Sequence, residues 1–453
     1  MALWARLGKW QKVAGAAGAV ILAGAVVVVV VSFATGGGGS AAGPQETPTV
    51  EADRTPTRTP AGGRTPTPRP TPVLFSGLFD GVPMSREEWE ARKDLPPLAV
   101  MVDNNPAGYP QSGLDKADLV YEAFVEGRIT RFLALYWRQE SEFIEPVRSA
   151  RTPFVILASE LQALFGHAGN STTPGPACSA CQVTEWGIYD IDSFRGGTGP
   201  AFYRDSERRA PHNLVTTTAR MREVGTALGY VGPLTVQPWR FKDDFEGTEG
   251  APEVGAFEVG FGARNVAWHV TQWHWDEATN TYLRFSMGGP HLDGQTGEQL
   301  RFKNVVVLRA PWSYGDEYGH VVYEQFGTGP ATIYMDGKAI EAEWRKPDRT
   351  ARTRFYDTEG NEVRFNRGST WIAMIGPSEQ VLSGLTPADL PPLPAFTPPP
   401  SNDNDDTEPP PQPSATNVPS TAAPTATPAP PTATSEPGPT AVPTEAPTEE
   451  SSE

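Results

Sequence analysis

Two arginines stand three residues apart in the stretch EPVRSARTP, residues 145–153. Guanidinium groups bind carboxylates and phosphates through paired hydrogen bonds, so Arg148 and Arg151 are candidates for an anion-binding site. Pro153 suits the first turn of a helix, where exposed N–H groups and the helix dipole also attract anions. The alternative is an internal ion-pair network in which these arginines neutralise nearby glutamates of the same chain.

A second polar group lies in the stretch RRAPHNL, which contains Arg208, Arg209, His212 and Asn213. If the fold brings the two groups together, the four arginines would surround His212 and Asp103, the residue that ends the apolar run PLAVMVD. We expect these seven residues to bind an anionic or polyhydroxyl ligand if one exists. The alternative is that His212 caps or packs a loop.

A histidine beside a carboxylate acts as a general acid or base near neutral pH. The catalytic candidates are therefore Glu122, Glu126 and His212, in a hydrolase of envelope glycans or phosphoesters. The chain contains no G-x-S-x-G nucleophile motif, phosphate loop or dinucleotide fingerprint. Because the histidines also lack the spacing of a metal site, we expect neither a metal nor a cofactor.

The two cysteines of the chain, Cys178 and Cys181, lie in the stretch GPACSACQV. A disulfide that closes this loop, a pair of free thiols, and a metal or redox pair are the alternatives. A zinc site would need two further ligands, and His167 is the only nearby candidate. A redox C-x-x-C motif normally opens a helix, whereas the Gly and Pro residues here predict a loop.

Residues 13–34 form an apolar run without a charge, long enough at about 1.5 Å per residue to cross a bilayer core of about 30 Å. Three basic residues and no acid precede it, which predicts that residues 1–12 stay in the cytoplasm. The alternative is a cleaved signal peptide, because a Ser-Phe-Ala sequence resembling a cleavage site ends the run. Both alternatives place the rest of the chain outside the cytoplasm.

Two segments of biased composition flank the middle of the chain. Residues 35–72 form a Gly- and Thr-Pro-rich stalk, and residues 397–453 form an acidic Pro- and Thr-rich tail that we expect to be disordered. The segments before residue 73 carry +4 and the tail carries −9, so the remaining chain carries −12 of the net charge of −17. This acidity argues against nucleic acid as a partner. The interactions that we expect are with the membrane, through the N-terminal anchor, and with a ligand of the cell envelope.

The middle of the chain predicts an α+β fold with two parts. Residues 73–235 mix helices and strands, and residues 250–380 read as mainly antiparallel strands. Glu122 and Glu126 would share one face of an expected strand, and Asp336-Gly337 predicts a tight hairpin. The strands expected in the first part are 97–103, 119–126 and 131–137, and the helices are 153–164 and 217–228.

Long strings of this sequence resemble the YerB-like family of bacterial lipoproteins, a domain of unknown function. The strings are AVMVDNNPAGYPQSGLDKADLVYEAFVEGRITRFLALYW, EPVRSAR, HAGNS and RRAPHNL, followed by YLRFSMGGPHLDGQTGEQLRFKNVVVL and TWI for its second domain. The resemblance covers residues 95–377 and implies a membrane-tethered, extracytoplasmic domain of two parts, without a reaction or catalytic residues. Family members carry a lipobox cysteine after the signal, and this chain has none there, so the apolar segment itself would have to serve as the anchor.

The leading hypothesis is thus a membrane-tethered extracytoplasmic module that binds or interacts with a component of the cell envelope. The rival hypothesis is the hydrolase. A carboxylate within hydrogen-bond reach of His212 in an open cleft would favour the enzyme, and arginines with free donors and no such pair would favour the binding module. If every arginine is buried against a glutamate, both proposals lose their support. The sequence makes no prediction of the oligomeric state.

Overall fold

The computed structural model describes residues 75–230 and 234–397 of the chain. The predicted anchor at residues 13–34, the stalk, and the tail beyond residue 397 lie outside the described residues. Among the residues that the structure describes, no helix is long and apolar enough to cross a membrane. The anchor and its alternative, a cleaved signal, therefore stay predictions.

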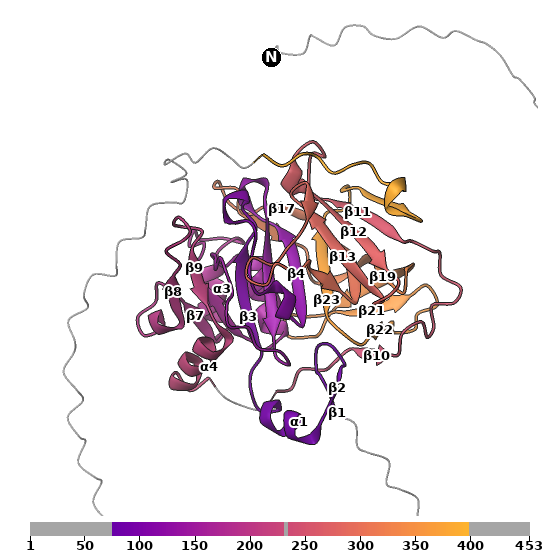
Figure 1. The fold of residues 1–453 in the computed structure, drawn as a ribbon. Coiled ribbons are helices and arrows are strands. Elements are labelled where there is room, and N and C mark those ends of the chain that lie inside the picture. The colour runs from indigo at the N-terminus through magenta and orange to yellow at the C-terminus, as the bar shows by residue number, and fades with distance from the viewer. Residues whose placement is uncertain (1–74, 231–233, 398–453) are drawn as a thin grey trace, which may run out of the picture. The chain divides into compact units, whose positions relative to one another are not determined.

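The largest sheet has ten strands and combines both parts of the sequence (Figure 1). In sheet order these are β21 (Arg354–Asp357), β20 (Lys338–Lys346), β19 (Gly327–Met335), β16 (Asn304–Arg309), β23 (Thr370–Ile375), β4 (Leu119–Phe124), β5 (Thr130–Tyr136), β3 (Leu98–Asp103), β6 (Leu164–His167) and β7 (Asp190–Asp192). Strands β4 and β23 pair in parallel, which joins the two parts edge to edge. All residues of β3, β4, β5 and β23 are buried.

A second sheet of six strands is antiparallel throughout. Its strands are β14 (Gly289–Pro290), β13 (Thr281–Ser286), β12 (Val270–Asp276), β11 (Ala256–Gly260), β24 (Val381–Gly384) and β15 (Arg301–Phe302). Short two-stranded sheets complete the strands: β1 (Phe75–Ser76) with β2 (Pro83–Met84), β8 (Phe202–Arg204) with β9 (Leu214–Thr216), β10 (Arg240–Lys242) with β22 (Arg364–Asn366), and β17 (Trp312–Tyr314) with β18 (Val321–Tyr323).

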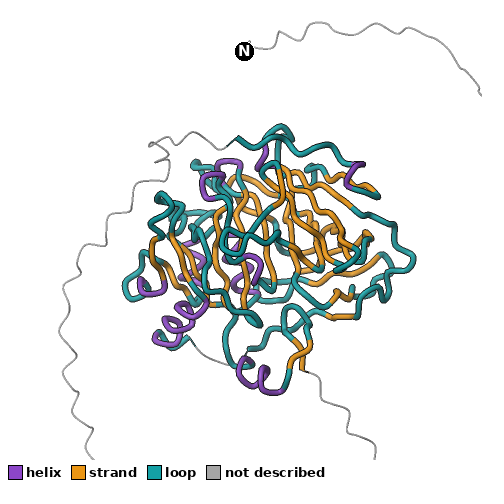
Figure 2. The backbone as a smooth tube through the Cα atoms, in the orientation of Figure 1, coloured by secondary structure: helices purple, strands orange, loops and turns teal. Residues whose placement is uncertain are grey.

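Strands make up far more of the described chain than helices do, as the orange and purple segments of Figure 2 show. The α-helices are α1 (Arg86–Arg92), α2 (Thr152–Glu160), α3 (Ser179–Glu185) and α4 (Thr218–Ala227). This content agrees with the α+β class. The division into a mixed first half and an antiparallel second half stays a prediction.

Helices α2 and α4 begin close to where the sequence predicts them. Pro153 lies in the first turn of α2, and the Thr217 side chain caps α4 by accepting a hydrogen bond from the Arg220 N–H, at 3.0 Å. Helix α2 ends at Glu160, earlier than the predicted residue 164, because β6 already begins at Leu164. The predicted hairpin at Asp336-Gly337 is confirmed, and both residues have the positive φ angles, 58° and 69°, that this tight turn requires.

Aromatic side chains connect the two sheets. The ring of Trp371 on β23 lies 5.1 Å from Phe132 on β5 and 5.4 Å from Trp273 on β12, measured between centroids. All three side chains are fully buried. The core therefore runs through both parts of the sequence, which fixes the ends of β3, β4 and β5 relative to the second sheet.

Candidate functional site

Asp103 and His212 form a hydrogen-bonded pair at the end of β3. The Nδ1 atom of His212 lies 2.6 Å from Oδ2 of Asp103, and the Arg148 Nε lies 3.3 Å from the same oxygen. Burial by itself would raise the pKa of Asp103, but the His212 hydrogen bond and the charges of Arg148 and Arg131 lower it to about 2. The carboxylate is therefore ionised at neutral pH, and it accepts the proton on Nδ1.

The other ring nitrogen of His212, Nε2, has no hydrogen-bond partner among the described residues. A carboxylate that holds the proton on Nδ1 leaves the lone pair on Nε2, as in acid–base histidines. The arrangement is thus capable of accepting a proton or a hydrogen bond from a ligand. It meets the hydrogen-bond part of the condition for the hydrolase, with Asp103 rather than either glutamate as the partner, but His212 is buried and does not lie in an open cleft.

Glu126 holds two guanidinium groups beside this pair. It accepts hydrogen bonds from the Arg151 Nε, at 2.8 Å, and from the Arg131 Nη2, at 3.2 Å. Burial opposes its ionisation, but the charges of Arg151 and Arg131 lower the pKa of Glu126 well below its ordinary value. Arg131 lies directly opposite Asp103 in the pairing of β3 with β5, so the Glu126 group adjoins the Asp103–His212 pair.

The structure corrects the prediction that Glu122 and Glu126 share a strand face. Strand β4 ends at Phe124, and Glu126 lies in the turn that follows. Glu122 faces the interior, where its carboxylate accepts hydrogen bonds from Arg284, at 3.0 Å, and from the Trp371 indole, at 3.1 Å. Its buried carboxylate is thereby committed to structural partners and is not placed to exchange a proton with His212.

Glu122 belongs to a closed ring of buried side chains, here called the Glu122 ring. In order around the ring, the members are Glu122, Thr130, Asn104, Gln111, His291 and Arg284. The Nε2–H of His291 donates to Gln111, and its Nδ1 accepts from Arg284. Burial and the Arg284 charge hold the pKa of His291 well below its ordinary value, so the imidazole is neutral and fits this pattern.

Arg208 and Asn213 hold the loop that carries His212. Arg208 donates to the carbonyl oxygens of Gly108, at 2.8 Å, and Pro110, at 2.7 Å, and its Nε lies 3.0 Å from a carboxylate oxygen of Glu145. Burial raises the pKa of Glu145 to about 7, although the Arg208 charge lowers it. These contacts position the loop rather than leaving Arg208 for a ligand.

Asn213 acts in the same way as Arg208. Its amide donates to the Asp205 carbonyl at 2.8 Å and accepts from Arg204 at 2.7 Å. Arg209 lies on the exposed side of the loop. Of the seven predicted ligand-binding residues, the structure therefore brings Asp103, Arg148 and His212 into direct contact and puts Arg151 beside them through Glu126.

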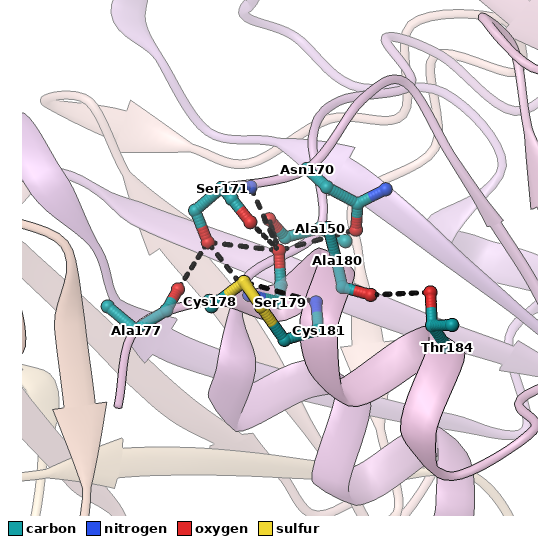
Figure 3. Close-up of a disulfide and its surroundings, with 9 residues drawn as sticks. All are labelled: Ala150, Asn170, Ser171, Ala177, Cys178, Ser179, Ala180, Cys181 and Thr184. Atoms are coloured by element: carbon teal, nitrogen blue, oxygen red, sulfur yellow. Dashed lines mark hydrogen bonds between the residues drawn. A yellow bond between two sulfur atoms is a disulfide. The ribbon is translucent and has the colours of Figure 1, made fainter. Parts of the chain in front are cut away.

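A disulfide joins Cys178 and Cys181 in the structure. The expectation of a loop at this motif was wrong, because Cys178 is the N-cap residue of α3 and the pair opens that helix (Figure 3). The hydroxyl of the intervening Ser179 donates to the Ala150 carbonyl at 3.3 Å and receives the Ser171 N–H at 2.9 Å. The cysteine-containing turn thus braces the segment from which Arg151 projects.

The sequence reasoning missed Arg131, Gln111, Arg284 and His291. The available signal for Arg131 and Arg284 was a charged residue inside an apolar strand pattern, RFLALYW and TYLRFS, where a buried charge requires a partner. Within the described residues, no group of three or more His, Cys, Asp or Glu side chains is arranged to hold a metal ion.

Comparison with known proteins supplies the family. Residues 83–231 match the model described as "Protein of unknown function (DUF3048) N-terminal domain", and residues 258–372 match the C-terminal domain of the same description. A Bacillus subtilis (strain 168) protein named "Putative lipoprotein YerB" is 31% identical over 280 residues, which cover 62% of this chain and 81% of that protein. The chain belongs to the YerB (DUF3048) family.

The YerB fold is also shared. The crystal structure of the YerB protein from Bacillus subtilis matches with a TM-score of 0.59 and 27% identity, and the match covers 68% of this chain and 99% of that one. The resemblance drawn from the sequence strings is therefore confirmed. The family description carries no activity, so the function must be argued from the site.

Proposed function

We propose that the protein is a membrane-tethered, extracytoplasmic module of the cell envelope that binds an anionic or polyhydroxyl ligand beside the Asp103–His212 pair. The apolar run at residues 13–34 and the stalk support the tether, and the relative is itself named "Putative lipoprotein YerB". A disulfide between Cys178 and Cys181 suits a compartment outside the cytoplasm.

The binding proposal rests on Glu126, whose single carboxylate is shared by two arginines. Arg131 and Arg151 both donate to Glu126, so this group has more positive than negative charge. The Arg131 Nε is buried and has no hydrogen-bond partner among the described residues, a condition that costs free energy unless a ligand or water completes it. The Nε2 of His212 would offer one further polar contact to the same ligand.

Binding of an inorganic anion tests this proposal directly. We expect phosphate to raise the melting temperature of the full chain, because a ligand that binds only the folded protein stabilises it. Arg148→Ala and Arg151→Ala should abolish the shift. Arg301→Ala, which removes an exposed arginine on β15, should retain it. Equal shifts in all these proteins would contradict the proposal.

Reporter fusions test the location. Alkaline phosphatase fused to the C-terminus of the full chain should be active in a bacterial host, and a green fluorescent protein fused at the same point and exported in the same way should stay dark. A bright fluorescent fusion with inactive phosphatase would place the folded domain in the cytoplasm and refute the location.

The hydrolase stays a second candidate because of the Asp103–His212 geometry. In this alternative His212 would accept a proton from the attacking water, and Asp103 would hold its orientation. Incubation with p-nitrophenyl phosphate and p-nitrophenyl glycosides should then release nitrophenol, and His212→Ala should lose about two orders of magnitude in rate. If the wild type releases nitrophenol no faster than the His212→Ala protein, the hydrolase is refuted and only the binding function remains.

A further inference from the structure

A cavity of about 670 Å³ lies at the opposite end of α2 from Arg151. One wall is the outer edge of the ten-stranded sheet, where β19, β20 and β21 run side by side (Figure 1). The C-terminal end of α2 and residues 235–237 also line the cavity. This cavity shares no residue with the site around Asp103 and His212.

Two arginines lie next to each other in this cavity. In the pairing of β20 with β21, Arg345 is directly opposite Arg354, and Thr328 on β19 is directly opposite Arg345. Like charges at opposed positions of neighbouring strands repel each other, so the pair destabilises the edge of the sheet unless anions neutralise it. Such a row is therefore a candidate clamp for an anionic group.

Each arginine of this row has one glutamate partner but stays partly exposed. Arg345 pairs with Glu343 and Arg354 pairs with Glu362, while 46% of the Arg345 side chain and 26% of the Arg354 side chain stay exposed. The Nη groups of Arg345 make no hydrogen bond within the described residues, and its guanidinium lies 4.1 Å over the ring of Tyr356. Donors thus remain available on the cavity wall.

The inner end of the cavity does not repel an anion. Its one lining carboxylate, Glu160, is held by the Lys346 Nζ at 2.6 Å and by the Arg352 Nη1 at 2.8 Å. The Nε of Arg352 is buried and has no hydrogen-bond partner within the described residues. The single carboxylate of the lining is therefore neutralised by two cations.

The rest of the lining suits a hydroxyl-rich molecule. Side chains with amide or hydroxyl groups are frequent: Gln162, Thr235, Gln237, Thr328, Thr350 and Tyr356. A second cavity of about 280 Å³ shares Gln162 and Thr350 with the first and adds the rings of Trp186 and Tyr189. Aromatic faces next to hydroxyl and amide groups match the apolar faces and hydroxyls of sugars.

We propose that the two adjoining cavities form a groove that binds an acidic oligosaccharide, with its carboxylate or phosphate held between Arg345 and Arg354. The hydroxyl groups of the sugar contact the polar lining, and a neighbouring sugar lies against Trp186 and Tyr189. The observation that carries this inference is the directly opposed, partly exposed arginine pair in a large cavity whose lining includes several amide and hydroxyl side chains. It does not depend on the proposed site at His212.

Isothermal titration calorimetry on the full chain, purified in detergent, tests the groove. The probes are trigalacturonate, glucose 6-phosphate, neutral maltotriose and adenosine monophosphate. We expect at least one acidic sugar to bind with a dissociation constant below about 1 mM and about tenfold more tightly than maltotriose. Tighter binding of trigalacturonate would identify the anionic group as a carboxylate, and tighter binding of glucose 6-phosphate would identify it as a phosphate. Failure of both acidic sugars, or tighter binding of the nucleotide, would overturn the proposal.

Matched variants locate the binding. Arg345→Gln and Arg354→Gln should each weaken the acidic sugar about tenfold. Arg364→Gln is the control, because Arg364 is also a partly exposed arginine with one glutamate partner but lies outside the cavity. Thr328→Trp should block the groove from an exposed strand position that tolerates a large side chain. Unchanged affinity in the Arg345, Arg354 and Thr328 variants, with melting temperatures that confirm folding, would refute the site, whereas phosphate stabilisation through Arg148 would be unaffected.

Discussion

Asp103 is fully buried and yet ionised, because its partners stabilise the charged carboxylate. Because its pKa falls from 3.8 to about 2 on folding, it contributes stability above about pH 4 and loses that contribution as the pH falls towards 2. We expect Asp103→Asn to lower the free energy of unfolding by about 2 kcal/mol at pH 6.

The measurement is urea unfolding of both proteins at pH 6 and at pH 2.5. The difference in free energy between wild type and Asp103→Asn should shrink at the lower pH, because the wild-type carboxyl is then partly protonated. A difference that is the same at both values would show that the ion pair does not stabilise the fold.

Arg284 is the residue whose removal should harm the fold most. It has no exposed surface, and it supplies hydrogen bonds to Glu122 and His291. Arg284→Ala leaves the Glu122 charge buried with only neutral donors, which costs about 3–5 kcal/mol. Chemical denaturation should reveal this loss, whereas Arg301→Ala on β15 should change stability by less than about 0.5 kcal/mol. Similar effects of the two substitutions would contradict the structural importance of the ring.

At the scale of elements, the positions of the site residues depend on how strands and helices end. Asp103 ends β3, Glu126 follows β4, and Arg151 occupies the N-cap position of α2. The sequence predicts the end of β3 and the start of α2 well, since apolar runs, Pro153 and polar turns are local signals. It does not predict that Glu126 turns away from the face of Glu122, because the strand ends before that residue and the two-residue alternation stops there.

The disulfide at the start of α3 has an effect that can be measured. Its loop is very short, so its removal should cost no more than about 2 kcal/mol. We expect a reductant to lower the melting temperature of the wild type and to speed amide exchange at residues 148–151, which Ser179 braces. The double variant Cys178→Ser/Cys181→Ser should already have the lower value and should not respond to reductant. A wild type that does not respond would argue against the brace.

At the scale of the whole molecule, the two parts of the sequence share one core. Strands β4 and β23 pair across the boundary, and the Glu122 ring takes four members from the first part and two from the second. Neither part can satisfy its buried polar groups alone. We therefore expect residues 73–235 and 250–380, expressed separately, to lack a cooperative unfolding transition.

Co-expression of the two parts is the control. Together they should form a soluble complex with the circular dichroism of the intact chain, because all pairings of the sheet are again available. If either part alone unfolds cooperatively and resists proteolysis as the intact chain does, the shared core is not required for folding.

Local patterns in the sequence predicted the α+β class, the hairpin at Asp336-Gly337, the starts of α2 and α4, and the family. These signals are local in the chain: apolar periodicity, capping residues and turn chemistry act over a few residues, and long strings identify relatives. The pairing of the buried charges, in contrast, depends on contacts between residues that are far apart in the chain. Asp103 bonds His212 across 109 residues, and Glu122 bonds Arg284 across 162. Residue type alone does not specify which carboxylate pairs with which guanidinium group. The packing of the strands that carry these side chains selects the partners and thereby forms the site.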